Sequence, residues 1–305
     1  MNAPTLPLDA LRVQFGDAVQ ENVPLAPYTS ARIGGAADVM LTVKSADELA
    51  EAVTGLRAQG LDFILLGGGS NVLVSDRGVR QVVVLNRAKA VQFYSGDQPR
   101  VRAESGTTFS QLAHRSATKG FAGLEWAAAV PGTVGGALYG NAGAFGGDVL
   151  HNLISAELLT GDGRVTWPVD KFGYGYRTSI LKRAELKAVI LSAELRLINA
   201  TKAEVSAKIA QFSADRKAGQ PPGASMGSMF KNPEGDHAGR LIEAAGLKGA
   251  RIGNAEISTL HGNFFINHGR TDASDIRALI DLARKTVKEK SGVELELEIE
   301  FVGEW

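Results

Sequence analysis

The sequence contains no cysteine, which excludes disulfides, thiolate catalysis, iron–sulfur clusters and cysteinyl-linked cofactors. It has no excess of charge, because 33 basic residues balance 33 acidic ones. This balance argues against a nucleic-acid binder, whose phosphate contacts need a basic surface. No run approaches the roughly 18 apolar residues of a membrane span. The first residues, MNAP, lack the basic start and apolar stretch of a signal peptide. We therefore expect a cytoplasmic protein without membrane insertion.

Histidine is scarce as well. The five histidines are His114, His151, His237, His261 and His268, and none of them is paired at HxH or HxxxH spacing. We therefore expect no metal site. At 305 residues, the chain can form one large domain or two to three smaller ones, each with a hydrophobic core. The sequence leaves the oligomeric state open.

Glycine is abundant, with 36 residues where average usage of about 7% would give about 21. Two stretches concentrate it: residues 66–73, with the sequence LGGGSNVL, and residues 131–136, with the sequence PGTVGG. Seven of the sixteen residues from Gly132 to Gly147 are glycine, a density that we expect no helix or ordinary strand to tolerate. Because glycine adopts positive φ and lets backbone N–H groups approach a ligand, the two loops predict one long ligand with a diphosphate. The alternative is a pair of glycine-rich turns in a β-rich fold.

The first glycine stretch follows a predicted helix and a predicted strand. Ser45 and Glu48 form a capping box for a helix that Gly60 ends, and residues 63–66 and 81–86 are apolar enough for buried strands. The loop after residue 66 does not follow the pattern GxGxxG, and no helical pattern comes after it, since residues 72–74 continue as strand. Both features argue against a Rossmann-type nicotinamide site.

The composition of the chain changes near residue 200. Residues 109–119 predict a helix and residues 151–199 predict mostly strands, whereas residues 202–217 predict a charged amphipathic helix, at which we place a domain boundary. A long helix follows, with its apolar positions at Ile276, Leu279, Ile280, Ala283 and Val287. Residues 294–302 predict a final strand with its apolar side chains on one face and four glutamates on the solvent-exposed face.

Two further segments combine polar groups that chemistry can use. Residues 227–233, GSMFKNP, bring together a hydroxyl, an amine and an amide, and they also fit a strand that begins at glycine and ends at Asn-Pro. Residues 172–179, FGYGYRTS, place Arg177 among aromatic side chains. A stacked surface arginine is the alternative interpretation of this second segment.

Taken together, these segments resemble the UDP-N-acetylenolpyruvoylglucosamine reductase family, nearly from end to end. The matching segments are YTSARIGG at 28–35, the two glycine stretches, NAGA at 141–144, YRTS at 176–179, GSMFKNP at 227–233, AGRLIE at 238–243, HGNF at 261–264 and GVELELEI at 292–299. Only 50 residues lie between Arg177 and Ser228, too few for the tyrosine-bearing loop of one subtype, so the chain resembles the shorter, second subtype. Two departures are a stretch before Gly227 that is one residue short and Gly262 in place of the usual alanine.

The resemblance implies an α+β fold. It consists of a two-lobed FAD-binding domain of the vanillyl-alcohol-oxidase (PCMH) type, followed by a C-terminal α/β substrate domain. With the composition change, we predict an N-terminal segment at 1–27, the FAD-binding domain at 28–200, with lobes at about 28–86 and 87–200, and the substrate domain at 201–305. The resemblance also implies non-covalent FAD and NADPH as the reductant. The implied substrate is UDP-N-acetylglucosamine enolpyruvate, which is reduced to UDP-N-acetylmuramate in peptidoglycan precursor synthesis.

The same resemblance assigns site residues. Arg177, Ser228 and Glu298 are carried over as catalytic residues. Arg177 provides a fixed charge for the substrate carboxylate, and Ser228 donates a proton to carbon. Glu298 is either protonated or paired with Arg177. Tyr176, Lys231 and Asn232 are carried over as substrate contacts. FAD contacts are expected at Gly67, Gly68, Gly69, Ser70, Asn71, Val72, Leu73, Pro131, Gly132, Thr133, Gly135, Gly136, Asn141, Ala142 and Gly143.

Two other functions compete with this one. An oxidase of the same superfamily often carries flavin linked to histidine or cysteine, but this chain has no cysteine and no histidine near either glycine stretch. A non-catalytic flavin or nucleotide-sugar binding module would not need Arg177, Ser228 and Glu298 together. Turnover of a UDP-sugar with NADPH, as opposed to simple quenching of flavin fluorescence, distinguishes the enzyme from the binding module.

Overall fold

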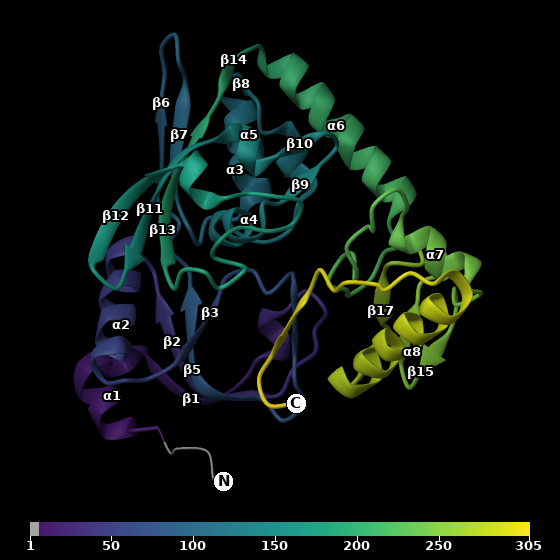
Figure 1. Cartoon of the computed structure of the whole chain (residues 1–305). Coiled ribbons are helices and arrows are strands. Elements are labelled where there is room, and N and C mark those ends of the chain that lie inside the picture. The colour runs from purple at the N-terminus through teal and green to yellow at the C-terminus, as the bar shows by residue number, and fades with distance from the viewer. Residues whose placement is uncertain (1–5) are drawn as a thin grey trace. The chain divides into compact units, whose positions relative to one another are not determined.

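The computed structural model describes residues 6–305 and divides them into two compact units (Figure 1). The central unit holds Leu41–Gly68 and Val84–Arg216. The terminal unit holds the described residues up to Met40, together with Gly69–Val83 and Lys217–Trp305. The chain therefore passes between the units inside strand β2 (Ala36–Val43), between Gly68 and Gly69, inside strand β5 (Val79–Asn86) and inside helix α6 (Lys202–Gly219). A four-stranded sheet has the order β1 (Val19–Pro24), β2, β5, β3 (Phe63–Leu66).

A five-stranded sheet forms the centre of the central unit. Its order is β12 (Gly163–Pro168), β11 (Leu153–Thr160), β13 (Val189–Arg196), β7 (Arg100–Glu104), β6 (Val91–Tyr94). Neighbouring strands in it pair antiparallel. Helix α4 (Val134–Gly140) packs on β13 and β7, and α3 (Phe109–Thr118) packs on the 3-10 turn Glu125–Ala129 (Figure 1). Phe109, Leu158 and Leu195 are fully buried in the core between these elements.

Two short pairings, a four-residue helix and helix α2 (Ala46–Ala58) complete the central unit. β8 (Phe121–Ala122) pairs with β14 (Ile198–Asn199), and β9 (Gly143–Ala144) pairs with β10 (Gly147–Asp148), which leads into α5 (Val149–Asn152). Helix α2 begins as the capping box predicts, because the Ser45 hydroxyl accepts a hydrogen bond from Glu48 N at 3.1 Å. The Glu48 carboxylate accepts from Lys44 N instead of Ser45 N, at 2.7 Å.

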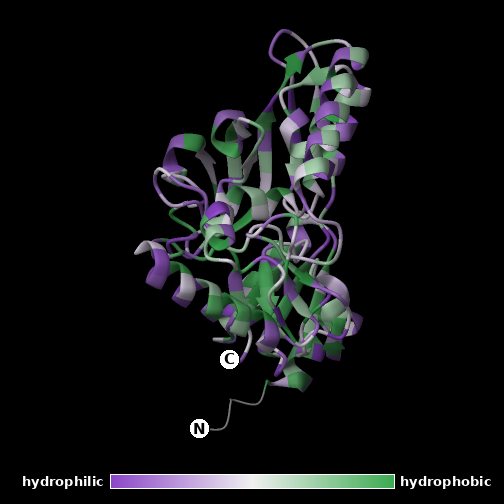
Figure 2. Cartoon of the chain, turned by 90° about the vertical axis from the view of Figure 1, so that its right-hand side faces the viewer, coloured by the Kyte–Doolittle hydropathy of each residue, from purple (hydrophilic) through white to green (hydrophobic). Residues whose placement is uncertain are grey.

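The terminal unit packs two helices around a small antiparallel sheet. The sheet has the order β15 (Arg251–Ile252), β16 (Ala255–Ile257), β17 (Phe265–Asn267), and α8 (Ala273–Ser291) packs against β15, β16 and α7 (Ala238–Ala244). All five predicted apolar positions of α8 are fully buried in the core, which confirms that helix. The ribbons in Figure 2 carry hydrophilic and hydrophobic stretches side by side, as amphipathic helices require. The unit also contains α1 (Leu8–Phe15), β4 (Val72–Val74) and β18 (Glu300–Val302).

The prediction that the second glycine stretch excludes a helix is wrong. Residues Val134–Gly140 form α4, whose first turn is capped by the Thr133 hydroxyl, which accepts from Gly136 N at 3.4 Å. A Cβ on Gly135 would lie 2.9 Å from the Ser105 Cβ, closer than real Cβ contacts allow. Glycine is therefore used here to let a short helix approach a neighbouring segment, and packing compensates for its low helix propensity.

The predicted strand at 294–302 is also wrong in extent. Only β18, Glu300–Val302, is strand, and residues 298 and 299 form a bend. The two faces do not alternate as predicted: Leu295 and Ile299 are buried, but Phe301 is exposed and Glu298 is half-buried. The bend breaks the period of two, so Glu298 has a different environment from Glu294 and Glu296, both of which are exposed.

Candidate active site

The first glycine loop offers backbone N–H groups to a ligand. The N–H groups of Gly68, Gly69, Ser70 and Asn71 donate no hydrogen bond to any residue between 6 and 305. Gly69 has φ +58°, and a Cβ there would lie 2.1 Å from the Tyr28 carbonyl oxygen, so only glycine fits. Ser30 N donates to Gly69 O at 2.9 Å and holds the loop from the same side. Four successive N–H groups without protein acceptors suit the oxygens of a diphosphate.

The two glycine stretches meet inside the central unit. A Cβ on Gly68 would lie 2.8 Å from Gly132 Cα, and one on Gly67 would lie 2.6 Å from the Thr133 hydroxyl oxygen. Gly132 has φ +99°, but neither Gly68 nor Gly135 is in the left-handed region. The reason for glycine at these two positions is therefore close approach of the backbone, whereas the positive φ expected of the two loops occurs at Gly69 and Gly132.

Arg177 is fixed beside the residues that follow α4. It lies in a tight turn in which Gly175 and Thr178 exchange backbone hydrogen bonds, and its own φ is +55°, a strained value for a non-glycine residue. Its Nη2 donates to Gly143 O at 2.7 Å, and its guanidinium lies 5.2 Å from the centre of the exposed Tyr176 ring. The half-buried Arg177 is therefore more constrained than a stacked surface arginine.

Asn141, which follows α4, connects this arginine turn to helix α5. Its Nδ2 donates to Gly175 O at 3.0 Å and its Oδ1 accepts from Leu150 N at 3.0 Å. The side chain is buried, and its backbone is left-handed with φ +47°. Asn141 and Gly143, both predicted from the sequence to contact FAD, thus each form one hydrogen bond that holds the arginine turn.

Ser228 lies on a segment that a buried carboxamide holds in place. Asn263, which is 2% exposed, accepts from Phe230 N at 2.9 Å through Oδ1 and donates to Phe230 O at 2.8 Å through Nδ2. The backbone carbonyl of Asn263 accepts a hydrogen bond from Met229 N at 2.8 Å. Three hydrogen bonds therefore fix the two residues after Ser228, and with them the direction of the half-buried serine.

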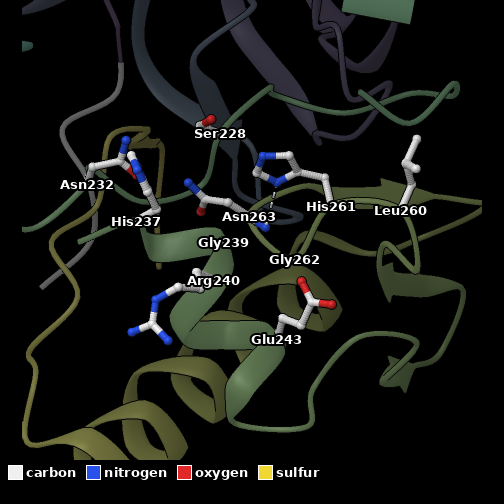
Figure 3. A pocket seen from close by; sticks show the side chains of 10 residues that line it. All are labelled: Ser228, Asn232, His237, Gly239, Arg240, Glu243, Leu260, His261, Gly262 and Asn263. Atoms are coloured by element: carbon white, nitrogen blue, oxygen red, sulfur yellow. Dashed lines mark hydrogen bonds between the residues drawn. The ribbon is translucent and has the colours of Figure 1, made fainter. Parts of the chain in front are cut away.

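A cavity of about 260 Å³ opens beside Ser228 in the terminal unit (Figure 3). Its walls include Asn232, Arg240, His261 and Asn263. His261 Nδ1 accepts from Asn263 N at 3.2 Å, and Figure 3 shows the other ring nitrogen on the side of Ser228. Burial lowers the pKa of the His261 imidazole, so the ring is neutral at pH 7 and carries its proton on Nε2.

The two polar residues after Ser228 already have partners. Lys231 forms an ion pair with Glu296, and Lys231 N donates to Glu296 O at 2.8 Å. Asn232 Oδ1 accepts from Ala238 N at 3.1 Å and so caps the first residue of α7. The Asn232 side chain also lines the cavity, as Figure 3 shows.

Glu298 is hydrogen-bonded to the residue after Ser228, although 69 residues lie between Ser228 and Glu298 in the sequence. Glu298 N donates to Met229 O at 3.0 Å, and Phe230 forms a bridge with Leu297. The structure therefore places the segment that carries Ser228, Lys231 and Asn232 beside the backbone of Glu298 in the terminal unit, and Arg177 beside Gly143 in the central unit. Sequence reasoning gives no role to His261 or Asn263; the polar, glycine-containing pattern of the HGNF segment that holds them is the available signal.

Comparison with known proteins decides the family. Residues 220–302 match the family model described as UDP-N-acetylenolpyruvoylglucosamine reductase, C-terminal domain, and residues 37–167 match an FAD binding domain. A UDP-N-acetylenolpyruvoylglucosamine reductase of Chloroflexus aggregans is 44% identical over 289 residues, which are 93% of this chain and 97% of the relative. The chain belongs to this reductase family. The predicted family and its flavin cofactor are thereby confirmed.

Further members agree. The reductase of Rubrobacter xylanophilus is 42% identical over 94% of this chain and 96% of its own length. The crystal structure of the reductase from Thermus caldophilus has a TM-score of 0.78 and 34% identity, and it covers 93% of this chain and 98% of that one. The predicted α+β fold, with an FAD-binding domain and a C-terminal domain, is confirmed, whereas the domain boundaries and the shorter subtype stay predictions. Within residues 6–305, no helix is both long and apolar enough to cross a membrane, and no group of three potential metal ligands occurs.

The residues present fit FAD. The open N–H groups at 68–71 provide donors for its diphosphate, and the glycines at which the two stretches meet leave no room for a Cβ. No histidine lies in either glycine stretch, and the chain has no cysteine. These residues are therefore suited to hold the cofactor through hydrogen bonds and shape.

Proposed function

We propose that this reductase converts UDP-N-acetylglucosamine enolpyruvate to UDP-N-acetylmuramate, with NADPH as the reductant, in the cytoplasmic synthesis of peptidoglycan precursors. The observation that carries the proposal is the hydrogen bond from Glu298 N to the carbonyl of Met229, the residue after Ser228, in a chain that matches the reductases over more than nine-tenths of its length. Ser228 itself lines a polar cavity. An oxidase or a binding module has no need for Ser228 and Glu298 together.

Bound FAD supplies hydride chemistry, by which the reducing equivalents of NADPH reach the enolpyruvyl double bond. Hydride addition to one carbon of that bond leaves negative charge on the other carbon and its carboxylate. Arg177 suits this carboxylate, because a guanidinium stays charged and binds carboxylates with two donors. Its bond to Gly143 O and its constrained turn fix it before the charge develops, as electrostatic stabilisation requires.

Ser228 donates the proton that completes the reduction. The hydride and this proton together saturate the double bond, and the serine recovers its proton from solvent. A hydroxyl is a weak acid, but the carbanionic carbon is a far stronger base, so the transfer is favourable. The hydrogen bonds from Asn263 to the next two residues keep the hydroxyl oriented.

Glu298 and the cavity complete the proposed site. Glu298 either donates a hydrogen bond as a protonated acid or acts as the ionised partner of Arg177, and the Glu298→Gln variant described in the Discussion distinguishes these roles. Tyr176, Lys231 and Asn232 are proposed to contact the substrate. Lys231 would then exchange its present partner Glu296 for an anionic oxygen of the ligand.

Separate measurement of the two half-reactions of Ser228→Ala tests the proposal. NADPH should reduce the flavin of the variant at the wild-type rate, because that step needs no proton at the substrate carbon. Reoxidation by UDP-N-acetylglucosamine enolpyruvate should slow by roughly 10²–10⁴-fold if Ser228 is the general acid. Stopped-flow absorbance follows both steps, and Ser274→Ala, which removes an exposed hydroxyl from the first turn of α8, is the control. Wild-type enzyme that fails to turn over this substrate, or unchanged reoxidation in Ser228→Ala, would contradict the proposal.

A further inference from the structure

The C-terminal segment changes its hydrogen-bonding partner at Glu298. Before this residue it bonds to the segment after Ser228, with Lys231 N to Glu296 O at 2.8 Å and Glu298 N to Met229 O at 3.0 Å. After it, β18 pairs in parallel with β4, in register Glu300 with Val72. Glu298 is thus held by its N–H on the Ser228 side and by its carbonyl on the other side.

Asn71 provides the hold on that carbonyl. Its side-chain Nδ2 donates to Glu298 O at 3.0 Å, and its own carbonyl accepts from Glu300 N at 3.0 Å. One residue of the first glycine loop therefore brackets Glu298 and Ile299, the two residues of the bend. Because the peptide planes on both sides of Glu298 are bonded, the direction of its side chain depends on these contacts.

The same loop presents the N–H groups that suit the diphosphate of FAD, including that of Asn71 itself. On its other side the loop is fixed, because Ser30 N bonds Gly69 O and a Cβ on Gly69 would strike Tyr28 O. A ligand that orders residues 68–71 therefore also orders Asn71 Nδ2, and through it Glu298. This arrangement differs from the role suggested by the sequence, in which the Asn71 side chain contacts FAD.

We propose that Asn71 is a positioning residue that couples occupancy of the FAD loop to the placement of Glu298. The inference rests on the proposed function in taking Glu298 as catalytic and the loop as the flavin site. In this arrangement the backbone of Asn71 serves the cofactor, while its carboxamide serves the glutamate. Binding of flavin to the loop then stabilises the glutamate in its working position.

Hydrogen exchange gives a test that needs no turnover. Protein stripped of FAD and protein reloaded with it are compared for wild type, Asn71→Ala and the control Asn267→Ala. Asn267 is matched, since it is also a carboxamide of the terminal unit that donates to a backbone carbonyl, but that carbonyl is Ala31 O, at 2.8 Å, and not Glu298 O. FAD should slow exchange at the amides of Glu298 and Glu300 by about tenfold or more in wild type and in the control, and by less than about threefold in Asn71→Ala.

Flavin affinity and the half-reactions complete the test. Asn71→Ala should bind FAD within about threefold of wild type but should be reoxidised by substrate about 10–100-fold more slowly, because misplacement of a catalytic group costs on that order. Equal protection of Glu298 and Glu300 in wild type and Asn71→Ala would overturn the coupling. Loss of FAD binding with normal reoxidation of the loaded fraction would make Asn71 a simple flavin ligand and would overturn it as well.

Two precautions keep the outcomes separate. If Asn71→Ala does not fold, Asn71→Asp provides the same comparison, since it keeps the size of the side chain and removes the donor. If wild type shows no turnover of the enolpyruvyl substrate, the proposed function fails, but the exchange experiment still decides whether the FAD loop and Glu298 are coupled.

Discussion

Replacing Gly68 with alanine should weaken FAD binding through one misplaced methyl group. The new Cβ would lie 2.8 Å from Gly132 Cα and 3.3 Å from Gly132 C, both backbone atoms that cannot rotate away. Ordinary contact begins near 3.4 Å, so the two glycine stretches must separate by several tenths of an ångström. Because φ at Gly68 is not in the left-handed region, the penalty comes from this contact and not from backbone strain.

The size of the effect follows from overpacking. Inserting a methyl group into a tightly packed contact typically costs about 1–3 kcal/mol. If the protein relieves this strain by moving the loops out of their FAD-binding position, the free energy of FAD binding becomes less favourable by the same amount. Because about 1.4 kcal/mol corresponds to a tenfold change in Kd, the affinity for FAD should fall roughly 5–150-fold. Fluorescence titration of stripped protein with FAD measures this change, and the flavin content of purified protein should fall with it.

Gly161→Ala is the matched control for this experiment. Gly161 lies in the turn between β11 and β12 of the same unit and does not have positive φ, and a Cβ added there would meet no atom within 4 Å. This variant should bind FAD with wild-type affinity. If Gly68→Ala binds FAD within about threefold of Gly161→Ala, the contact between the two glycine stretches does not shape the flavin site.

Three other substitutions test the remaining site residues. Arg177→Lys should lower kcat by about 10²–10³ with little change in flavin content, because two-donor charge stabilisation is lost; a fall of under about threefold in NADPH oxidation would make it a surface arginine. Glu298→Gln should slow flavin reoxidation, whereas Glu294→Gln should not. A mild loss of the reoxidation rate favours a protonated glutamate, and a severe loss favours an ionised one. Equal effects of both variants would remove Glu298 from the mechanism. His261→Asn should flatten the pH dependence of unfolding measured in urea between pH 8 and 5. The lowered pKa of folded His261 means that the unfolded chain binds more protons, so wild-type stability falls as pH drops below about 6.5, and an unchanged slope in the variant would contradict this.

Local patterns in the sequence are enough to predict several elements. The apolar positions of α8 follow a helical period that its burial reproduces, and the Ser45 cap marks the start of α2. These predictions succeed because each depends on residues within a few turns of one another. The segment at 134–140 shows the opposite case: glycine content argues against a helix, and only the close approach to Ser105 explains why a helix forms there.

The contacts that define the site are beyond such reasoning. Asn71 and Asn263 are visible as polar residues in glycine-containing segments, but their partners Glu298 and Phe230 are distant in sequence. Nothing in the composition of the loop around Asn71 identifies a carbonyl more than 200 residues away. Family resemblance supplies the catalytic candidates without showing what holds them.

The four glutamates at the C-terminus show how both kinds of reasoning combine. A period of two makes Glu294, Glu296, Glu298 and Glu300 equivalent, and only resemblance to the family selects Glu298. The structure gives a physical reason for that choice, because the segment exchanges one partner for another at this residue and bends there. Glu294 and Glu296 pair with Lys288 and Lys231 at exposed positions, whereas Glu298 is half-buried between the segment that carries Ser228 and the loop that carries Asn71. A change of hydrogen-bonding partner within one extended segment thus sets Glu298 apart from Glu294 and Glu296, two neighbours of the same type.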